Sequence, residues 1–178
     1  MHQDCERILL TEEQIRTRVR EIAREVDEKY QGKNPLVVGI LKGSIIFYAD
    51  FIRCLSMPVE LDFMAVSSYG SGTVSSGKLK IKKDLDKDVA GKDVVIVEDI
   101  IDSGFTLANL KALLTERGAK SVLIVTLLNK KGRREYDISP DYNCFDIENE
   151  FVVGYGLDYN EKYRHLPYIG ILKHEIYE

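Results

Sequence analysis

The chain has 178 residues, of which 44% are hydrophobic and 30% charged, a composition typical of a globular domain large enough to bury a core. Its 25 Lys and Arg residues against 29 Asp and Glu residues give a formal net charge of −4, which argues against a nucleic-acid binder with a basic face but allows a small phosphate pocket. The N-terminal residues lack the apolar run of a signal peptide, and no stretch approaches the roughly 18–20 apolar residues of a membrane helix, so we expect neither a nucleic-acid nor a membrane partner.

Helical and strand patterns alternate along the chain. Thr11 and Gln14 match a capping box, and apolar residues at helical spacing predict a helix over 12–29. A second helix is predicted over 45–55, and a third stops at Gly118. Short apolar runs predict strands over 35–41, 59–67, 94–97, 121–128, 151–153 and 169–172.

This alternation predicts an α/β fold, with a mainly parallel central sheet flanked by helices, in a single domain over residues 1–178. Residues 68–78 are dominated by Ser and Gly and predict a mobile loop. The same stretch nearly matches a nucleotide-binding P-loop, but Leu79 stands where Ser or Thr must bind Mg²⁺. Residues 80–82 alternate like a strand, so we interpret the match as chance.

The cysteines indicate a reducing compartment. Cys5, Cys54 and Cys144 are widely spaced and odd in number, and none belongs to a CxxC pair. This pattern favours reduced thiols in a cytoplasmic protein over a disulfide framework or a zinc site.

Acidic and hydroxyl side chains follow the predicted strand 94–97, where ligands of parallel sheets bind. Glu98 and Asp99 come first, and such carboxylates suit ribose hydroxyls or a Mg²⁺ ion. The start of the next helix then offers hydroxyls and free backbone N–H groups that suit a phosphate monoester. These groups belong to Ser103, Gly104 and Thr106.

Residues 94–106, Val-Val-Ile-Val-Glu-Asp-Ile-Ile-Asp-Ser-Gly-Phe-Thr, resemble the 5-phosphoribosyl 1-diphosphate signature of type I phosphoribosyltransferases, and their paired isoleucines resemble its hypoxanthine-guanine branch. The resemblance implies that Glu98 and Asp99 hold the ribose hydroxyls and help to place Mg²⁺. It also implies that loop 102–106 holds the 5′-phosphate, and that Asp102 faces N7 of the purine as general acid and base. Phe105 departs from the family, where this position is often polar.

Two further segments resemble substrate loops of the family, and the likeness extends over about residues 10–172. Lys42 and Gly43 match the pyrophosphate loop, which often carries a non-proline cis peptide before its lysine. Ser68 and Tyr69 match a loop that closes over the reacting centre.

The base-side residues match the hypoxanthine enzymes in particular. The resemblance implies that Lys130 donates to O6 of the purine, that Phe151 stacks on its ring and that Val152 offers backbone groups to its edge. Asp158 is implied to meet the base or a second Mg²⁺, and Arg164 the pyrophosphate.

The resemblance also implies a small hood formed by N- and C-terminal segments, a Mg²⁺ cofactor, and assembly as a homodimer or homotetramer. Phe47 and Tyr48 on the predicted helix 45–55 suit an interface and the core equally. The basic run that follows Lys130 has no assigned role and is interpreted as a solvated turn; it consists of Lys131, Arg133 and Arg134.

Three alternatives stay open. A non-catalytic nucleotide sensor would lack base-side residues such as Lys130 and Phe151, and a P-loop hydrolase is disfavoured by Leu79. A phosphoribosyltransferase for another base, such as orotate or adenine, is disfavoured by the matches at Lys130 and Val152. The sequence leaves the choice between hypoxanthine and guanine, and the use of xanthine, undecided.

Overall fold

A computed structural model describes residues 1–68 and 79–177 of the chain. The predicted loop 68–78, Tyr69 included, therefore lies outside the described residues apart from the strand position of Ser68.

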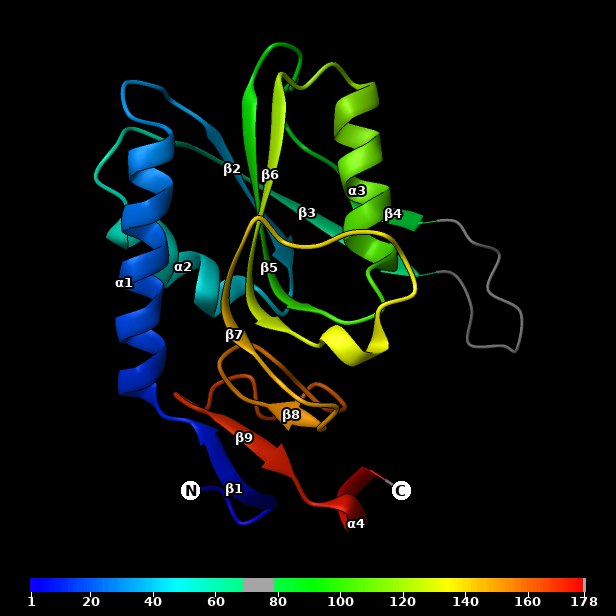
Figure 1. The fold of residues 1–178 in the computed structure, drawn as a ribbon. Coiled ribbons are helices and arrows are strands. Elements are labelled where there is room, and N and C mark those ends of the chain that lie inside the picture. Colours follow the sequence, from blue (N-terminus) through cyan, green and yellow to red (C-terminus); the bar gives the residue numbers. More distant parts are fainter. Residues whose placement is uncertain (69–78, 178) are drawn as a thin grey trace.

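A six-stranded sheet forms the centre of the molecule, with the order β4-β3-β2-β5-β6-β7 (Figure 1). Every neighbouring pair is parallel except β3 and β4, so the predicted mainly parallel sheet is confirmed. The strands are β2 (Leu36–Leu41), β3 (Glu60–Ser68), β4 (Leu79–Lys83), β5 (Asp93–Ile101), β6 (Ser121–Asn129) and β7 (Tyr142–Asp146).

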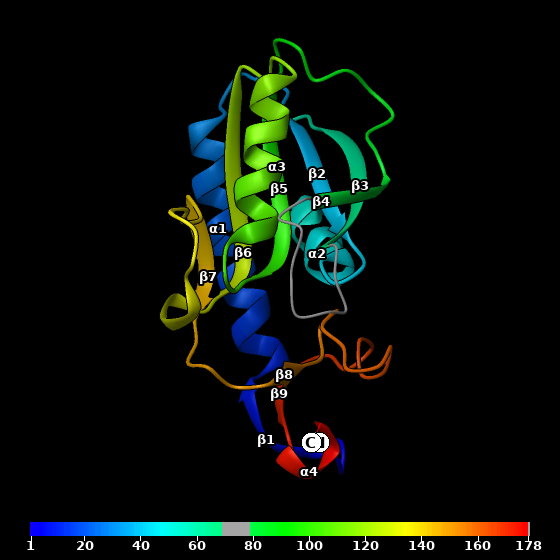
Figure 2. The same cartoon turned by 90° about the vertical axis from the view of Figure 1, so that its right-hand side faces the viewer.

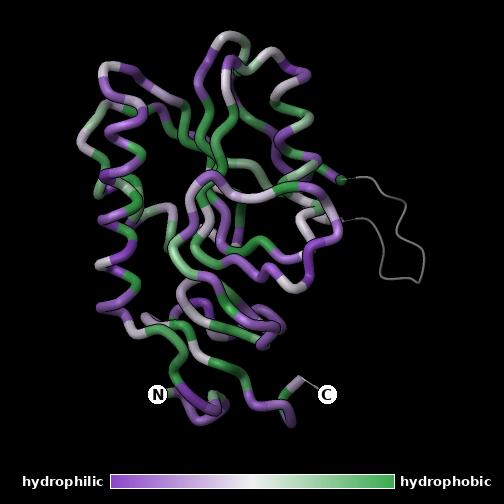
Figure 3. The backbone as a smooth tube through the Cα atoms, in the orientation of Figure 1, coloured by the Kyte–Doolittle hydropathy of each residue, from purple (hydrophilic) through white to green (hydrophobic). Residues whose placement is uncertain are grey.

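Helices cover both faces of this sheet (Figures 1 and 2). Helices α1 (Glu12–Lys29) and α2 (Ile45–Cys54) pack on the face that carries Val37 and Val95, whereas α3 (Phe105–Glu116) packs on the face that carries Val38 and Ile96. Because both faces are buried, the central strands are continuous apolar runs, which appear as the hydrophobic centre of Figure 3.

The helix ends follow from local chemistry. Thr11 and Gln14 form the predicted capping box: the Gln14 backbone N–H donates to Thr11 Oγ1 at 3.2 Å, and the Thr11 N–H donates to Gln14 Oε1 at 2.9 Å. Helix α3 starts after Gly104 at φ +90° and is followed by Gly118 at φ +84°, both in the left-handed region that glycine favours. Among the described residues, no helix is long and apolar enough to cross a membrane.

Segments from both ends of the chain build a second, three-stranded sheet, which confirms the predicted hood. Its order is β1-β9-β8, from β1 (Cys5–Leu10), β8 (Val152–Val153) and β9 (Ile169–Leu172), followed by the short helix α4 (His174–Tyr177). The sequence did not predict β1 or β7. Strand β1 contains charged residues and is exposed over half its length, so its sequence carries little of the apolar pattern that predicts a strand. It forms a strand by pairing with β9.

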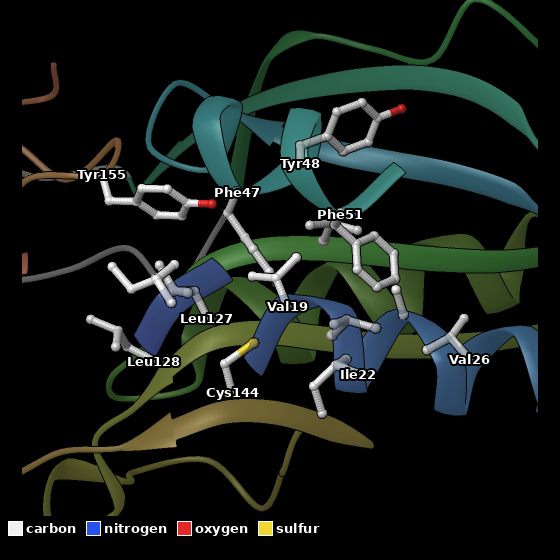
Figure 4. Close-up of a cluster of buried hydrophobic side chains, with 14 of the residues drawn as sticks. Val19, Ile22, Val26, Phe47, Tyr48, Phe51, Leu127, Leu128, Cys144 and Tyr155 are labelled. Atoms are coloured by element: carbon white, nitrogen blue, oxygen red, sulfur yellow. The ribbon is translucent and has the colours of Figure 1, made fainter. Parts of the chain in front are cut away.

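The aromatic residues of α2 belong to the core and not to an interface. Phe47 is fully buried and Tyr48 is 2% exposed. The Tyr48 hydroxyl donates to the Val37 carbonyl oxygen at 3.0 Å, and Figure 4 shows Phe47 and Phe51 pointing toward Val19 and Ile22 of α1. The helix therefore turns its aromatic face inward, and of the two interpretations of Phe47 and Tyr48 the structure supports the core.

Candidate active site

A cavity of about 460 Å³ lies at the carboxyl ends of β2 and β5. It brings together residues from three segments that the sequence singled out separately. They are Gly43, Glu98, Asp99, Asp102, Ser103, Gly104, Thr106, Asp158 and Arg164. The other predicted site residues with described side chains, Lys42, Lys130, Phe151 and Val152, stand outside its lining.

The carboxylate pair lies inside strand β5 and not after it, because β5 continues to Ile101 beyond the predicted end at Val97. Glu98 is buried, and burial together with repulsion from Asp99 raises the pKa of its carboxyl well above the usual range. Burial also raises the pKa of Asp99, against the opposing charge of Arg164. A cation bound beside the two carboxylates would favour their charged forms.

Glycine is required where Asp99 meets the preceding loop. A Cβ atom at position 43 would lie 1.7 Å from Asp99 Oδ2, and one at Gly156 would lie 2.0 Å from the Gly43 carbonyl oxygen. The Leu41–Lys42 peptide bond is cis, as the resemblance implied. Three segments far apart in the sequence thus meet at Gly43, which lines the cavity.

Residues 135–136, which sequence reasoning missed, hold the loop 102–106 in place. The backbone N–H groups of Glu135 and Tyr136 both donate to the Ser103 carbonyl oxygen, at 2.9 and 3.1 Å. The Phe105 ring packs edge-on against Tyr136, with centroids 5.6 Å apart. Phe105 therefore has an apolar partner of its own, which accounts for its departure from the family's polar preference.

Asp102 lines the cavity and lies beside a basic side chain. Its Oδ1 lies 3.3 Å from Arg133 Nε, but the contact lacks hydrogen-bond geometry, and this buried oxygen accepts no hydrogen bond within the described part of the chain. The Asp102 side chain as a whole is 38% exposed, so its exposed part, and not the buried Oδ1, can meet a ligand.

The basic run after Lys130 is more than the solvated turn that the sequence indicated. Arg133 lies against Asp102, Arg134 donates to Asn129 Oδ1 at 2.5 Å, and Lys131 pairs with Asp146 at 2.7 Å. Sequence reasoning missed these roles because each partner comes from a different element.

Lys130 is buried at the end of β6, where its backbone N–H donates to the Ile101 carbonyl oxygen at 3.0 Å. Burial lowers the pKa of its ammonium group, and the charge of Asp102 opposes that change. Lys130 and Asp102 are therefore electrostatic neighbours, as a shared base site requires.

Phe151 and Val152 stand at the edge of the hood. The Phe151 ring is 36% exposed, and its carbonyl oxygen accepts a hydrogen bond from Leu172 N–H at 2.8 Å. Strand β8 is the outer strand of the hood sheet and pairs only with β9 among the described strands, so Val152 lies beside an open strand edge.

Arg164 is fixed by acidic and backbone partners. Its Nη2 lies 2.9 Å from Asp158 Oδ1, and its Nη1 donates to the Gly156 carbonyl oxygen at 2.8 Å. The other oxygen of Asp158 accepts the Glu161 backbone N–H at 2.8 Å. Both oxygens of Asp158 are thus engaged, while the Arg164 Nε is buried without a hydrogen-bond partner in the described residues.

The predicted metal ligands do not gather into one cage. Within residues 1–68 and 79–177, no group of three His, Cys, Asp or Glu side chains is arranged to hold a metal ion. Mg²⁺ is commonly held by one or two carboxylates together with substrate phosphates and water, and Glu98 and Asp99 match that donor set.

The fold combines a mainly parallel sheet with a small hood sheet, and the cavity combines the acidic end of β5 with the start of α3. These features define the class of this protein. The chain belongs to the phosphoribosyl transferase domain family, whose profile matches residues 8–160.

Its relatives include named purine enzymes. The chain is 52% identical over 178 residues to the hypoxanthine-guanine phosphoribosyltransferase of Bacillus subtilis, and the matched region covers 100% of this chain and 99% of that protein. It is 55% identical over 177 residues to the bifunctional protein TilS/HprT of Listeria monocytogenes, covering 99% of this chain but 27% of that relative's length. A crystal structure of a hypoxanthine phosphoribosyltransferase from Staphylococcus aureus matches with a TM-score of 0.96 at 49% identity, covering 100% of this chain and 97% of that one.

Proposed function

We propose that this chain transfers the 5-phosphoribosyl group of 5-phosphoribosyl 1-diphosphate to N9 of hypoxanthine, and also of guanine, giving IMP or GMP and diphosphate in purine salvage. The observation that carries the proposal is the cavity in which a helix start, a buried carboxylate pair and Arg164 face one space. The names of the relatives support the choice of base.

The ribose phosphate binds along β5 and its following loop. Ser103, Gly104 and Thr106 surround the 5′-phosphate at the start of α3, where free N–H groups favour an anion. Glu98 and Asp99 accept hydrogen bonds from the ribose hydroxyls, and Lys42, Gly43 and Arg164 take the diphosphate.

Glu98 and Asp99 also suit Mg²⁺, because the ion prefers carboxylate oxygens and both side chains line the cavity. Bound there, Mg²⁺ would neutralise charge on the diphosphate. Asp158 is proposed to meet the base or a second Mg²⁺. We expect no transfer in excess chelator and recovery on addition of Mg²⁺, followed by release of diphosphate. Full activity in chelator would contradict the assignment.

The reaction breaks the bond between the anomeric carbon and the diphosphate oxygen, and the carbon gains oxocarbenium character as N9 attacks. Arg164 and Lys42 stabilise the charge that develops on the leaving group. Asp102, whose side chain lines the cavity and is 38% exposed, exchanges a proton with N7 of the base.

The segment 68–78, with Ser68 and Tyr69, is proposed to close over the centre and keep water from the cation. Amide hydrogen exchange in this segment should slow when both substrates bind. Exchange that is already slow in the free protein would contradict closure.

Lys130 is proposed to read O6 of the base. An ammonium group has three donors and no acceptor, so it favours a 6-oxo group and meets another donor in adenine. Phe151 supplies the face on which the base stacks, and the edge at Val152 supplies backbone groups.

We further propose a cytoplasmic homodimer or homotetramer that uses this single domain, residues 1–178. The three cysteines are free, as suits a reducing compartment. Sedimentation at micromolar concentration tests the assembly, and a monomer would contradict it.

The decisive experiment measures diphosphate release with hypoxanthine, guanine, xanthine, adenine and orotate in turn. The proposal expects turnover with hypoxanthine and guanine and little with adenine or orotate. Binding of the ribose diphosphate without transfer to any base would favour a non-catalytic sensor instead.

A further inference from the structure

One face of the Phe151 ring is already covered by another aromatic side chain. The Tyr177 ring is stacked on it, with centroids 4.6 Å apart and planes inclined by 18°. Tyr159 contacts Phe151 edge-on, with centroids 5.5 Å apart and planes at 89°. Phe151 is still 36% exposed, so part of its surface outside the stack with Tyr177 is open to a ligand.

Tyr177 is anchored to the hood and not to the loops that line the cavity. It belongs to α4, which lies at the end of the hood remote from the central sheet in both views (Figures 1 and 2). Its ring packs with the hood cluster around Val153 and Leu172 and contacts His174 edge-on. The Lys173 N–H donates to the Asp4 carbonyl oxygen at 3.0 Å and ties the start of this turn to the N-terminal segment.

We propose that Tyr177 is a positioning residue for the base: it holds the Phe151 ring in one plane, so that the opposite face is presented ready to stack on the purine. The inference rests on the proposed function. Stacked aromatic pairs gain energy beyond their buried area, and a ring held before binding loses less freedom when the base arrives. Removing Tyr177 should therefore weaken base binding and leave the ribose diphosphate site alone.

The test compares Tyr177→Ala with Tyr177→Phe. For Tyr177→Ala we expect the KM for hypoxanthine to rise roughly 2- to 10-fold, the range that stacked pairs contribute, with the KM for the ribose diphosphate unchanged. Tyr177→Phe should restore the wild-type value, since the Tyr177 hydroxyl makes no hydrogen bond to any described residue. Tyr177→Leu keeps apolar volume without a flat ring and should behave like the alanine variant, which covers the case in which alanine unfolds α4.

A matched control and a double-mutant cycle separate positioning from loosening of the hood. Ile176→Ala removes another apolar contact of α4 with the same cluster and should leave both KM values unchanged. In a Phe151→Ala background, Tyr177→Ala should add no further rise, because Tyr177 acts through that ring. Three outcomes would overturn the inference. They are an equal rise in KM for both substrates, a Tyr177→Phe variant that does not regain the wild-type KM for hypoxanthine, or a Tyr177→Ala effect on that KM that is the same with and without Phe151. An inactive wild-type protein would instead overturn the proposed function.

Discussion

Lys42 Nζ lies 3.0 Å from Glu161 Oε2, although the two residues are 119 positions apart in the chain. The same oxygen lies 3.6 Å from Arg164 Nη2. The Lys42 ammonium group lowers the pKa of the Glu161 carboxyl by hydrogen bonding to it. The Glu161 carboxylate therefore lies beside both cations that are proposed to hold the diphosphate, although Asp158 is the nearer partner of Arg164.

Glu161→Gln should strengthen the binding of inorganic diphosphate with Mg²⁺. In this variant the anion no longer has to displace the Glu161 carboxylate from Lys42 and Arg164. Because exposed ion pairs contribute little, calorimetry should show a Kd lower by at most about 5-fold at low salt, and the difference should narrow as salt rises. Glu28→Gln, which removes the same charge from a pair with Arg24 on α1, is the control. Equal affinities at low salt would contradict the competition.

Gly43→Ala should abolish most transfer while the fold persists, because the new methyl group would overlap the Asp99 carboxylate. Displacing a group that positions the substrate by about 1 Å can cost ~10²-fold in rate. Steady-state kinetics and thermal unfolding are measured together. Gly132→Ala, where a Cβ meets nothing within 4 Å, serves as control and should match wild type; an active Gly43→Ala variant would refute the required close approach.

Asp102→Asn should keep substrate binding and lower turnover, since the amide preserves the shape but cannot accept a proton. Loss of a general acid or base typically costs ~10²–10⁴-fold in kcat. Asp137→Asn in the nearby exposed loop is the control. If Asp102→Asn kept wild-type turnover across pH, Asp102 would not handle the proton.

Lys130→Met should impair the use of hypoxanthine far more than binding of the ribose diphosphate. The wild-type protein should prefer hypoxanthine over adenine by ~10³-fold or more, because adenine would leave a desolvated charge facing a donor. Competition assays measure the preference, and Lys131→Met, beside it but paired with Asp146, is the control. A Lys130→Met variant that keeps the preference would show that the O6 contact lies elsewhere.

Glu98→Gln should make the protein more stable at neutral and alkaline pH while harming activity. The pKa of Glu98 is raised in the folded state. Once the pH exceeds the pKa of this group in the unfolded chain, the unfolded state is favoured, and the loss of stability grows until the pH passes the pKa in the folded state. We therefore expect Glu98→Gln to unfold at a higher Tm than the wild-type protein at pH 8. The gain should vanish near pH 4; an equal gain at pH 4 and pH 8 would exclude the charge as its cause.

Much of the fold, and the part of the site proposed to bind the ribose phosphate, follow from short stretches of sequence. Helix α1 begins and ends where its capping box and apolar spacing predict, and the residues of loop 102–106 are contiguous, so one segment carries both the helix start and its acidic neighbours. Such features depend on residues within a few positions of one another, and the chain's own geometry brings them together.

Tertiary structure alone decided the contacts that surround these groups. Asp99 against Gly43, Glu161 against Lys42 and Tyr177 against Phe151 each join different elements. Strand β1 and the inward face of Phe47 likewise depend on partners far along the chain. The physical reason is that periodicity reports which face of an element is apolar, but not which distant element packs on it or which charges that packing leaves side by side.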